Sequence, residues 1–387
     1  MKRIGIIIFA ALTAVLASCS DDAILSDQGV DIVQPAPELV PLSISTGTQT
    51  KTILSGTTVN WTADDQIAVF DDLHYRNRFE AVSVDGSDAV FEGKVTARTT
   101  DFYAVYPYSG AVGADSENIY VMLPADQQPV AGSFAEEHNV SIAHGTKAAE
   151  DVRADGLVFE NTCALLKFTV PAIFSSIGEA SFTADNRALA GKMIYSKDEK
   201  SVVGVTEGSN TVTLEGQLKG GKEYFFVVSP GEVNGFSLSI TDSSNGVTLT
   251  NESTKSFEAK AGTIQDLGEV KIVVKPRVWA QHVYSGGKHV RTDVWMDLGL
   301  PSGMEEYVES VEGWLQPMGG SVSNLVRTIS MSKDRGNVKF PYLLINPFES
   351  FGNKMCLSQG SYVANITYLL SGSGYVNTTV VAEIPAP

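Results

Sequence analysis

The chain is poor in cysteine and in basic residues. Its 387 residues include three cysteines, which are too few and too scattered for a disulfide framework or a CxxC zinc site. Its 28 Lys and Arg are outnumbered by 45 Asp and Glu, and the resulting net charge of -17 repels a phosphate backbone. The composition therefore excludes a broad nucleic-acid footprint, and we expect no nucleic-acid partner.

Catalytic motifs are also missing. The sequence has no HExxH pattern, no GxSxG turn and no pair of carboxylates that stands out as a general acid and base. Asp64-Asp65 and Asp71-Asp72 flank an expected strand, and we interpret them as turn residues rather than calcium ligands or hydrolytic carboxylates. We therefore predict that the protein is not an enzyme and has no cofactor and no metal site.

Two further groups of residues favour structural roles. His138 and His144 are six residues apart in a β-rich region, so we interpret them as surface or turn residues, with metal binding as the minor alternative. Cys163 lies in an apolar context that is typical of a buried structural thiol. A disulfide between Cys163 and Cys356 is disfavoured, because the two fall in different predicted domains.

The N-terminus has the three parts of a secretory signal. Lys2 and Arg3 precede an apolar run over residues 4–16, which is too short to span a membrane, and small residues follow it. The segment 16–19, Leu-Ala-Ser-Cys, resembles a bacterial lipobox, in which the cysteine becomes the acylated first residue. We therefore predict a signal peptide over residues 1–18 and a lipid on Cys19. The polar, acidic, proline-containing stretch that follows, residues 19–37, reads as a tether.

From residue 38 onward the dominant hydrophobic period is two. Val40, Leu42 and Ile44 alternate with other residues, which is typical of a strand with one buried face. Further strands are expected at residues 61–70, 121–123, 164–170, 211–214, 224–228, 236–240 and 270–274. No long helix is convincing, and the best helical candidate is 305–315, where Val308, Val311 and Leu315 have helical spacing.

The pattern predicts an all-β protein made of tandem β-sandwich domains. We place an N-terminal sandwich at 38–165, a second sandwich at 166–275 and an additional C-terminal β-rich module at 276–387. The last boundary follows a break at Lys275-Pro276.

A series of short motifs resembles the fimbrillins, the lipoprotein pilins of Bacteroidales-type bacteria. The motifs are Thr50–Leu54, Val59–Phe70, Phe102–Tyr108, Leu123–Gln128, Leu165–Val170, Leu189–Gly191 and Ala261–Gly268. They cover roughly residues 38–275. The acidic pair after Ser20 also resembles the signal that sends lipoproteins of these bacteria to the outer leaflet of the outer membrane, which favours a surface location.

The resemblance implies several properties. Fimbrillins consist of transthyretin-like, Greek-key sandwiches, are exported as lipoproteins, and polymerise after a protease removes the N-terminal strand. A strand from another subunit then fills the groove, so the implied partners are other pilin subunits and, through the lipid, the outer membrane. The C-terminal extension departs from a two-domain stalk pilin and would suit a tip or accessory subunit.

Lys51 is the first basic residue after Cys19, so a trypsin-like protease would cut there, just after the expected strand at 39–45. An exclusively Arg-specific protease would first meet Arg76. Cutting after Arg76 would also remove the expected strand at 61–70, which the first sandwich needs for its core. We therefore predict cleavage after Lys51.

The chain ends in an expected hairpin, 362–370 and 375–384. One face of its last strand carries Thr378 and four apolar residues, which are Val376, Val380, Ala382 and Ile384. Two interpretations stay open at this point. The strand either closes its own C-terminal domain or is donated to another subunit.

The leading functional prediction is a lipid-anchored, adhesive fimbrial subunit precursor. The alternative is a monomeric surface lipoprotein that uses the same fold to bind a host glycan or protein. The C-terminal module is dense in aromatic residues, namely Trp279, Tyr284, Trp295, Tyr307 and Trp314. Such rings are first of all core residues, although an exposed one can bind a sugar or a protein.

Overall fold

The structure is a computed structural model that describes residues 37–47, 53–54, 57–58, 61–138, 140–242, 244, 246–319, 326–332, 342–345, 357–371 and 374–386. Cys19, Lys51 and Cys356 lie outside the described residues. Within them the only helices are short 3-10 turns, at Tyr108–Gly110 (η1), Glu136–His138 (η2) and Met304–Tyr307 (η3). No helix of the described part is long and apolar enough to cross a membrane. The predicted all-β fold is confirmed.

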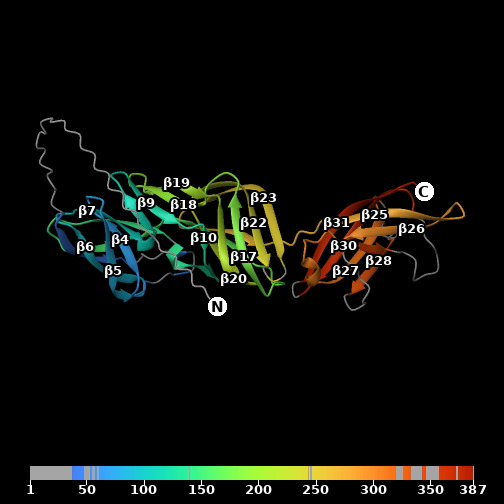
Figure 1. Ribbon diagram of the computed structural model, residues 1–387, viewed down its shortest axis with the longest axis horizontal. Coiled ribbons are helices and arrows are strands. Elements are labelled where there is room, and N and C mark those ends of the chain that lie inside the picture. Colours follow the sequence, from blue (N-terminus) through green and yellow to red (C-terminus); the bar gives the residue numbers. More distant parts are fainter. Residues whose placement is uncertain are drawn as a thin grey trace, which may run out of the picture. The chain divides into compact units, whose positions relative to one another are not determined.

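The first sheet contains eight of the described strands. Figure 1 labels four of them, β4, β5, β6 and β7. In sheet order they are β14 (Arg153–Leu157), β1 (Leu39–Thr46), β6 (Asp88–Thr96), β5 (Arg76–Asp85), β4 (Gln66–Phe70), β7 (Asp101–Tyr106), β13 (Ser141–Thr146) and β15 (Glu160–Asn161). Their inward side chains form a core around Trp61. The indole ring of Trp61 packs edge-on against Phe91, Tyr106 and Phe159, at centroid distances of 5.0, 5.2 and 5.4 Å.

Three further sheets surround a second core. One has the order β10 (Asp126–Gln127), β20 (Thr211–Lys219), β17 (Ser176–Ala184), β22 (Gly231–Asp242) and β23 (Val247–Ala259). The second of these sheets has the order β21 (Glu223–Val228), β16 (Ala164–Thr169) and β24 (Ile264–Glu269). The third has the order β19 (Ser201–Ser209), β18 (Ala190–Ser196), β9 (Asn118–Leu123) and β8 (Ala111–Ala114). Because β9 pairs with β18 and β10 with β20, strands from both sides of residue 165 share sheets. The domain boundary at 165 stays a proposal.

The C-terminal residues form two more sheets. One has the order β25 (Arg277–Ser285), β26 (Lys288–Asp297) and β29 (Tyr342–Ile345). The other has the order β28 (Val326–Ser332), β27 (Val308–Pro317), β30 (Gly360–Leu370) and β31 (Gly374–Ile384). Two small hairpins complete the described strands: β2 (Ile53–Leu54) with β3 (Thr57–Thr58), and β11 (Pro129–Val130) with β12 (Ser133–Phe134).

The helical interpretation of residues 305–315 is wrong. A single 3-10 turn, η3, is followed by strand β27, which pairs with β28 and β30. A register shift between Val308 and Ser310 in the pairing with β30 puts both Val308 and Val311 inside, which imitates helical spacing. Beyond it the pattern returns to period two, because Val311, Gly313 and Leu315 are buried.

One expected strand is shorter than predicted, and another is absent. The first begins at Gln66 rather than at Trp61, because residues 62–65 form a turn in which the Asp65 carboxylate accepts a hydrogen bond from the Thr62 backbone N–H at 2.7 Å. The stretch 270–274 is not a strand. Its neighbour β16 ends at Thr169, and the hydrogen bond from Val270 N to Thr169 O lies at the end of that ladder. Strand β24 therefore ends at Glu269.

Candidate functional site

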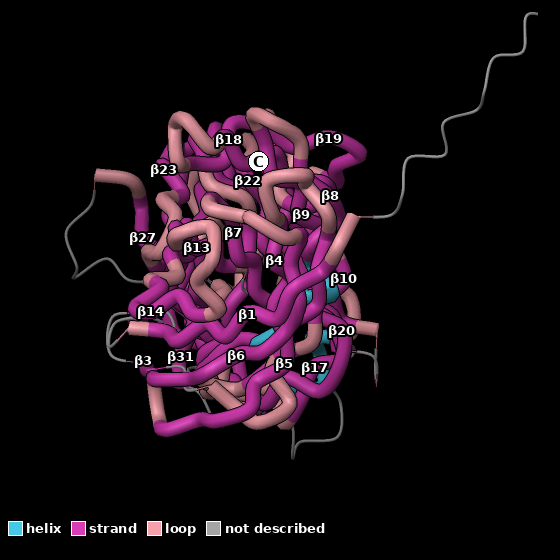
Figure 2. The backbone as a smooth tube through the Cα atoms, turned by 90° about the vertical axis from the view of Figure 1, so that its left-hand side faces the viewer, coloured by secondary structure: helices cyan, strands magenta, loops and turns pink. Residues whose placement is uncertain are grey.

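The candidate site is the position that β1 occupies in the first sheet, between β14 and β6, which we call the seat of β1. β1 runs antiparallel to β6, with Leu39 opposite Thr96 and Ser45 opposite Val90. On its other side it runs parallel to β14. Figure 2 shows β1 lying beside β6, with β5 next in the sheet. The N-terminal strand of the described fold is thus an internal member of its sheet.

The inward face of β1 fills the first core. Leu42 is 2% exposed and Ile44 is fully buried, and both belong to the cluster that contains Trp61 and Phe91. The alternation predicted from the sequence is confirmed. Burial of such side chains contributes about 1.5–3 kcal/mol each, so β1 is a substantial part of the stability of this core.

Polar contacts fix the register of β1 at its C-terminal end. The Thr46 hydroxyl accepts a hydrogen bond from Ala89 N at 2.8 Å, and Gly47 N donates to Leu157 O at 2.9 Å. The Ser45 hydroxyl donates to the Asp155 carboxylate at 2.7 Å. That bond, together with the neighbouring Arg153, lowers the pKa of Asp155. No ion pair of the described residues involves β1, so it is held by its ladders and its apolar face.

Loss of β1 would create a groove of defined chemistry. The facing edges of β6 and β14 would lose their backbone partners, and the floor would be the apolar core that Leu42 and Ile44 now cover. An extended strand with small or apolar alternate residues is the ligand that satisfies both features. Lys51, the predicted cleavage site, follows β1 in the sequence and stays a prediction.

The predicted C-terminal hairpin is present as β30 and β31. The two strands pair without a register shift, from Gly360 opposite Ile384 to Leu370 opposite Gly374. β31 is an edge strand, paired with β30 alone among the described strands. Of the candidate donor residues, Val376 and Val380 are half-buried, and Ala382 and Ile384 are buried in the C-terminal module itself. The predicted two-faced pattern is confirmed, whereas donation stays a prediction.

The paired aspartates are turn residues, as predicted. The buried Asp71 carboxylate accepts hydrogen bonds from the backbone N–H groups of Leu73, Tyr75 and Thr96, at 3.1, 3.1 and 3.0 Å. It also accepts from the Thr96 hydroxyl and the Asn77 amide. Asp72 accepts from two backbone N–H groups near the start of β7. These carboxylates therefore join turns.

Asp65 is also a turn residue whose carboxylate accepts hydrogen bonds. Besides the Thr62 N–H, it accepts a hydrogen bond from the Tyr106 hydroxyl at 3.0 Å, within the first core. The sequence did not show which aspartate of each pair faces inward. Alternation along the strand offered no signal for Asp71, because residues 67–71 are all buried.

The histidines and Cys163 also have structural surroundings. His144 stacks on Tyr103 at 4.6 Å, and its Nε2 contacts Asp101 Oδ1 at 2.5 Å. His138 is buried at the end of η2, and burial lowers its pKa. No group of three potential metal ligands occurs among the described residues. Cys163 is a free, buried thiol whose pKa burial raises to about 11, so it is not a thiolate at neutral pH.

The C-terminal aromatic residues have different surroundings. Tyr307 packs edge-on against Phe174 at 5.1 Å and donates a hydrogen bond to Asp242 at 2.6 Å, so it is a packing residue. Trp279 is 40% exposed and Tyr284 51% exposed, both on β25. The side chains of Trp295 and Trp314 lie outside the described part. A binding role for the exposed rings stays a prediction.

Solved structures with a similar build come from Bacteroides. A candidate cell adhesion protein from Bacteroides uniformis is 15% identical, with a TM-score of 0.40, and the match covers 59% of this chain and 92% of that one. A fimbrial protein from Bacteroides ovatus is 14% identical, with a TM-score of 0.30, and covers 60% of this chain and 49% of that one. A fimbrial protein from Bacteroides vulgatus is 10% identical, with a TM-score of 0.29, covering 58% and 95%.

At such identities and TM-scores the likeness is loose, and it does not by itself assign a function. No protein-family model matches the chain, and no curated protein matches it.

Proposed function

We propose that the chain is a structural and adhesive subunit of a surface filament, anchored by a lipid before it assembles. The observation that carries this proposal is the seat of β1. An N-terminal strand completes the core of the first sheet between β6 and β14, and the first basic residue after Cys19 follows it. Cleavage there would free the strand and leave a groove that an extended strand of another subunit fits. The fimbrillin-like motifs are in keeping with this route.

The anchor is proposed to be a lipid on Cys19. In the Cys19→Ala variant we expect the protein to leave the membrane fraction, because the chain carries a large net negative charge, which anionic lipid repels. Fractionation and labelling with an acyl-chain probe measure this. A Ser20→Ala variant is the control and should remain membrane-bound. Retention and labelling of the Cys19→Ala protein would contradict the anchor.

Maturation is proposed to remove β1 by a cut after Lys51. In Lys51→Gln we expect assembled material to disappear while the unprocessed, lipid-bound precursor accumulates, because β1 would stay in its seat. N-terminal sequencing of filaments from the unmodified chain should give Thr52. Arg76→Gln is the control and should assemble normally. Filaments whose chains begin at Asn77, or at Cys19, would exclude the Lys51 site.

The donor is proposed to be β31, whose face of Val376, Val380, Ala382 and Ile384 suits an apolar groove. Among the described strands it pairs with β30 alone, so its release would break that one ladder. One observation favours the alternative of a monomeric surface binder. Ala382 and Ile384 are buried within their own module, so release would expose part of its core.

A capping experiment separates the two functions. A chain truncated after Ser373 keeps the β1 seat but has no donor strand, so it should accept a strand and donate none. When it is co-expressed with the full chain, we expect shorter filaments in proportion to its dose. A chain lacking only Ala386 and Pro387 is the control and should leave filament length unchanged. Filaments of normal length containing the truncated chain would rule out β31 as donor, and purely monomeric surface material would favour the binder.

A further inference from the structure

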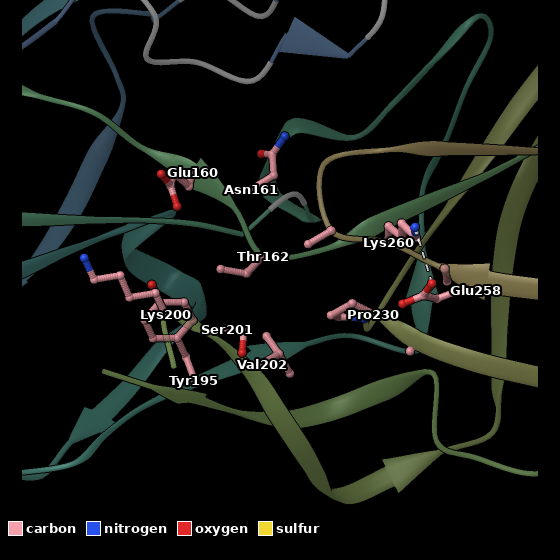
Figure 3. A pocket seen from close by; sticks show the side chains of 13 residues that line it. Glu160, Asn161, Thr162, Tyr195, Lys200, Ser201, Val202, Pro230, Glu258 and Lys260 are labelled. Atoms are coloured by element: carbon pink, nitrogen blue, oxygen red, sulfur yellow. Dashed lines mark ion pairs between the residues drawn. The ribbon is translucent and has the colours of Figure 1, made fainter. Parts of the chain in front are cut away.

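A pocket of mixed polar and apolar lining contains no residue of β1 or β31. Its volume is about 320 Å³, which is in the range of small-ligand sites. It is lined by β15, by β18, β19 and the turn between them, and by the ends of β22 and β23. Figure 3 shows Glu160, Tyr195 and Lys200 on one side of the pocket, with Glu258 and Lys260 on the other.

The two lysines of the pocket differ in their partners. Lys260 Nζ forms an ion pair with Glu258 Oε2 at 3.4 Å. Lys200 makes no ion pair with any described residue. It lies at the end of the β18–β19 turn with a left-handed backbone φ of 51°, and that turn presents it at the pocket rim. The pocket therefore contains one cation that lacks a carboxylate partner.

Tyr195 adds a second group without a partner. Its side chain is 7% exposed and lies in the pocket wall, and no described residue makes a hydrogen bond with its hydroxyl. Burial, with a contribution from the charge of Glu160, raises the pKa of Tyr195 to about 12, so the hydroxyl keeps its proton at neutral pH. Because no described residue occupies its hydrogen-bonding capacity, this hydroxyl can donate to, or accept from, a ligand in the pocket.

We propose that this pocket binds a sugar residue that carries a carboxylate, such as a uronic acid. The Lys200 ammonium would pair with the ligand carboxylate, and the Tyr195 hydroxyl and Glu160 carboxylate would bond ring hydroxyls. The charged and hydroxyl side chains in the lining disfavour a wholly apolar ligand, which would leave them without partners. Glu160 and Glu258 repel a phosphate with two negative charges more strongly than a carboxylate with one, which favours the carboxylate. This site extends the adhesive role and does not depend on strand exchange.

The test uses the purified full chain in detergent, with ligand-observed NMR or calorimetry at low salt. The probes are glucuronate, glucose as its neutral match, inorganic phosphate, and an oligosaccharide that ends in glucuronate. We expect saturable glucuronate binding at least about tenfold tighter than glucose binding, a difference of the size that one charge-assisted hydrogen bond contributes. Tighter binding of the oligosaccharide would identify a glycan chain as the source, and equal binding a free sugar acid.

Three variants assign the residues. Lys200→Gln should bind glucuronate no better than glucose, and Tyr195→Phe should bind it about fivefold more weakly, since it loses one hydrogen bond. Lys94→Gln removes an exposed charge on β6, outside the pocket, and should bind normally. Equal binding of glucuronate and glucose by the unmodified chain, preference for phosphate, or unchanged binding by Lys200→Gln would overturn the proposal. Filament formation by Lys200→Gln should be normal, so failure here is distinguishable from failure of the assembly proposal.

Discussion

The Ile44→Asp variant is expected to lose the folded first sheet. Ile44 is fully buried on the inward face of β1, so the substitution removes an apolar side chain from the core and places an unpaired carboxylate there. Together these changes should lower the free energy of unfolding of this part of the chain by at least about 4 kcal/mol. Hydrogen exchange measured by mass spectrometry should show loss of protection over residues 66–106.

Ser43→Asp is the matched control. It adds the same charge to the same strand one residue earlier, on the face opposite to Leu42 and Ile44. We expect its effect to be within about 1 kcal/mol of zero. Equal protection in the two variants would show that the seat of β1 does not support the core. In that case removal of β1 would open no groove, and the proposed assembly route would lose its basis.

Asp71→Ala is expected to give the second largest loss of stability. The Asp71 carboxylate is 2% exposed and accepts five hydrogen bonds, three of them from backbone N–H groups. Without it those donors are left unsatisfied in a buried setting. The expected decrease in the free energy of unfolding is about 3–5 kcal/mol. Urea unfolding followed by segment-resolved hydrogen exchange over 66–100 measures it.

Two comparisons make the Asp71 prediction specific. Asp72→Ala changes the neighbouring residue, which is exposed and accepts its hydrogen bonds near solvent, so its effect should stay below about 1 kcal/mol. Asp71→Asn keeps the shape but turns an NH₂ group toward N–H donors, so it should recover little of the loss. Similar stability of the Asp71→Ala and Asp72→Ala chains would contradict the role that we assign to Asp71.

The local sequence pattern was enough to locate a strand that has one solvent-exposed face and one buried face. The alternation at Leu42 and Ile44 located β1, and the alternation from Val376 to Ile384 located β31. Both worked because side chains along a strand alternate between its two faces with period two, whichever strands it pairs with. The pattern failed at 305–315, where a bulge made a strand look helical. It also failed at Trp61, which the pattern placed at the start of a strand. Trp61 is a buried residue that precedes a turn, and the strand begins at Gln66.

The sequence by itself determined the all-β class, the two-faced strands at each end of the fold, the buried thiol at Cys163 and the turn role of the paired aspartates. Only the tertiary structure decided that β1 lies between β6 and β14, that Asp71 rather than Asp72 faces inward, and that Glu160, Tyr195 and Lys200 share a pocket. The physical reason is separation along the chain. Periodicity and turn chemistry act over a few residues, whereas β1 pairs with residues about 50 and 110 positions away. No local pattern specifies such pairings.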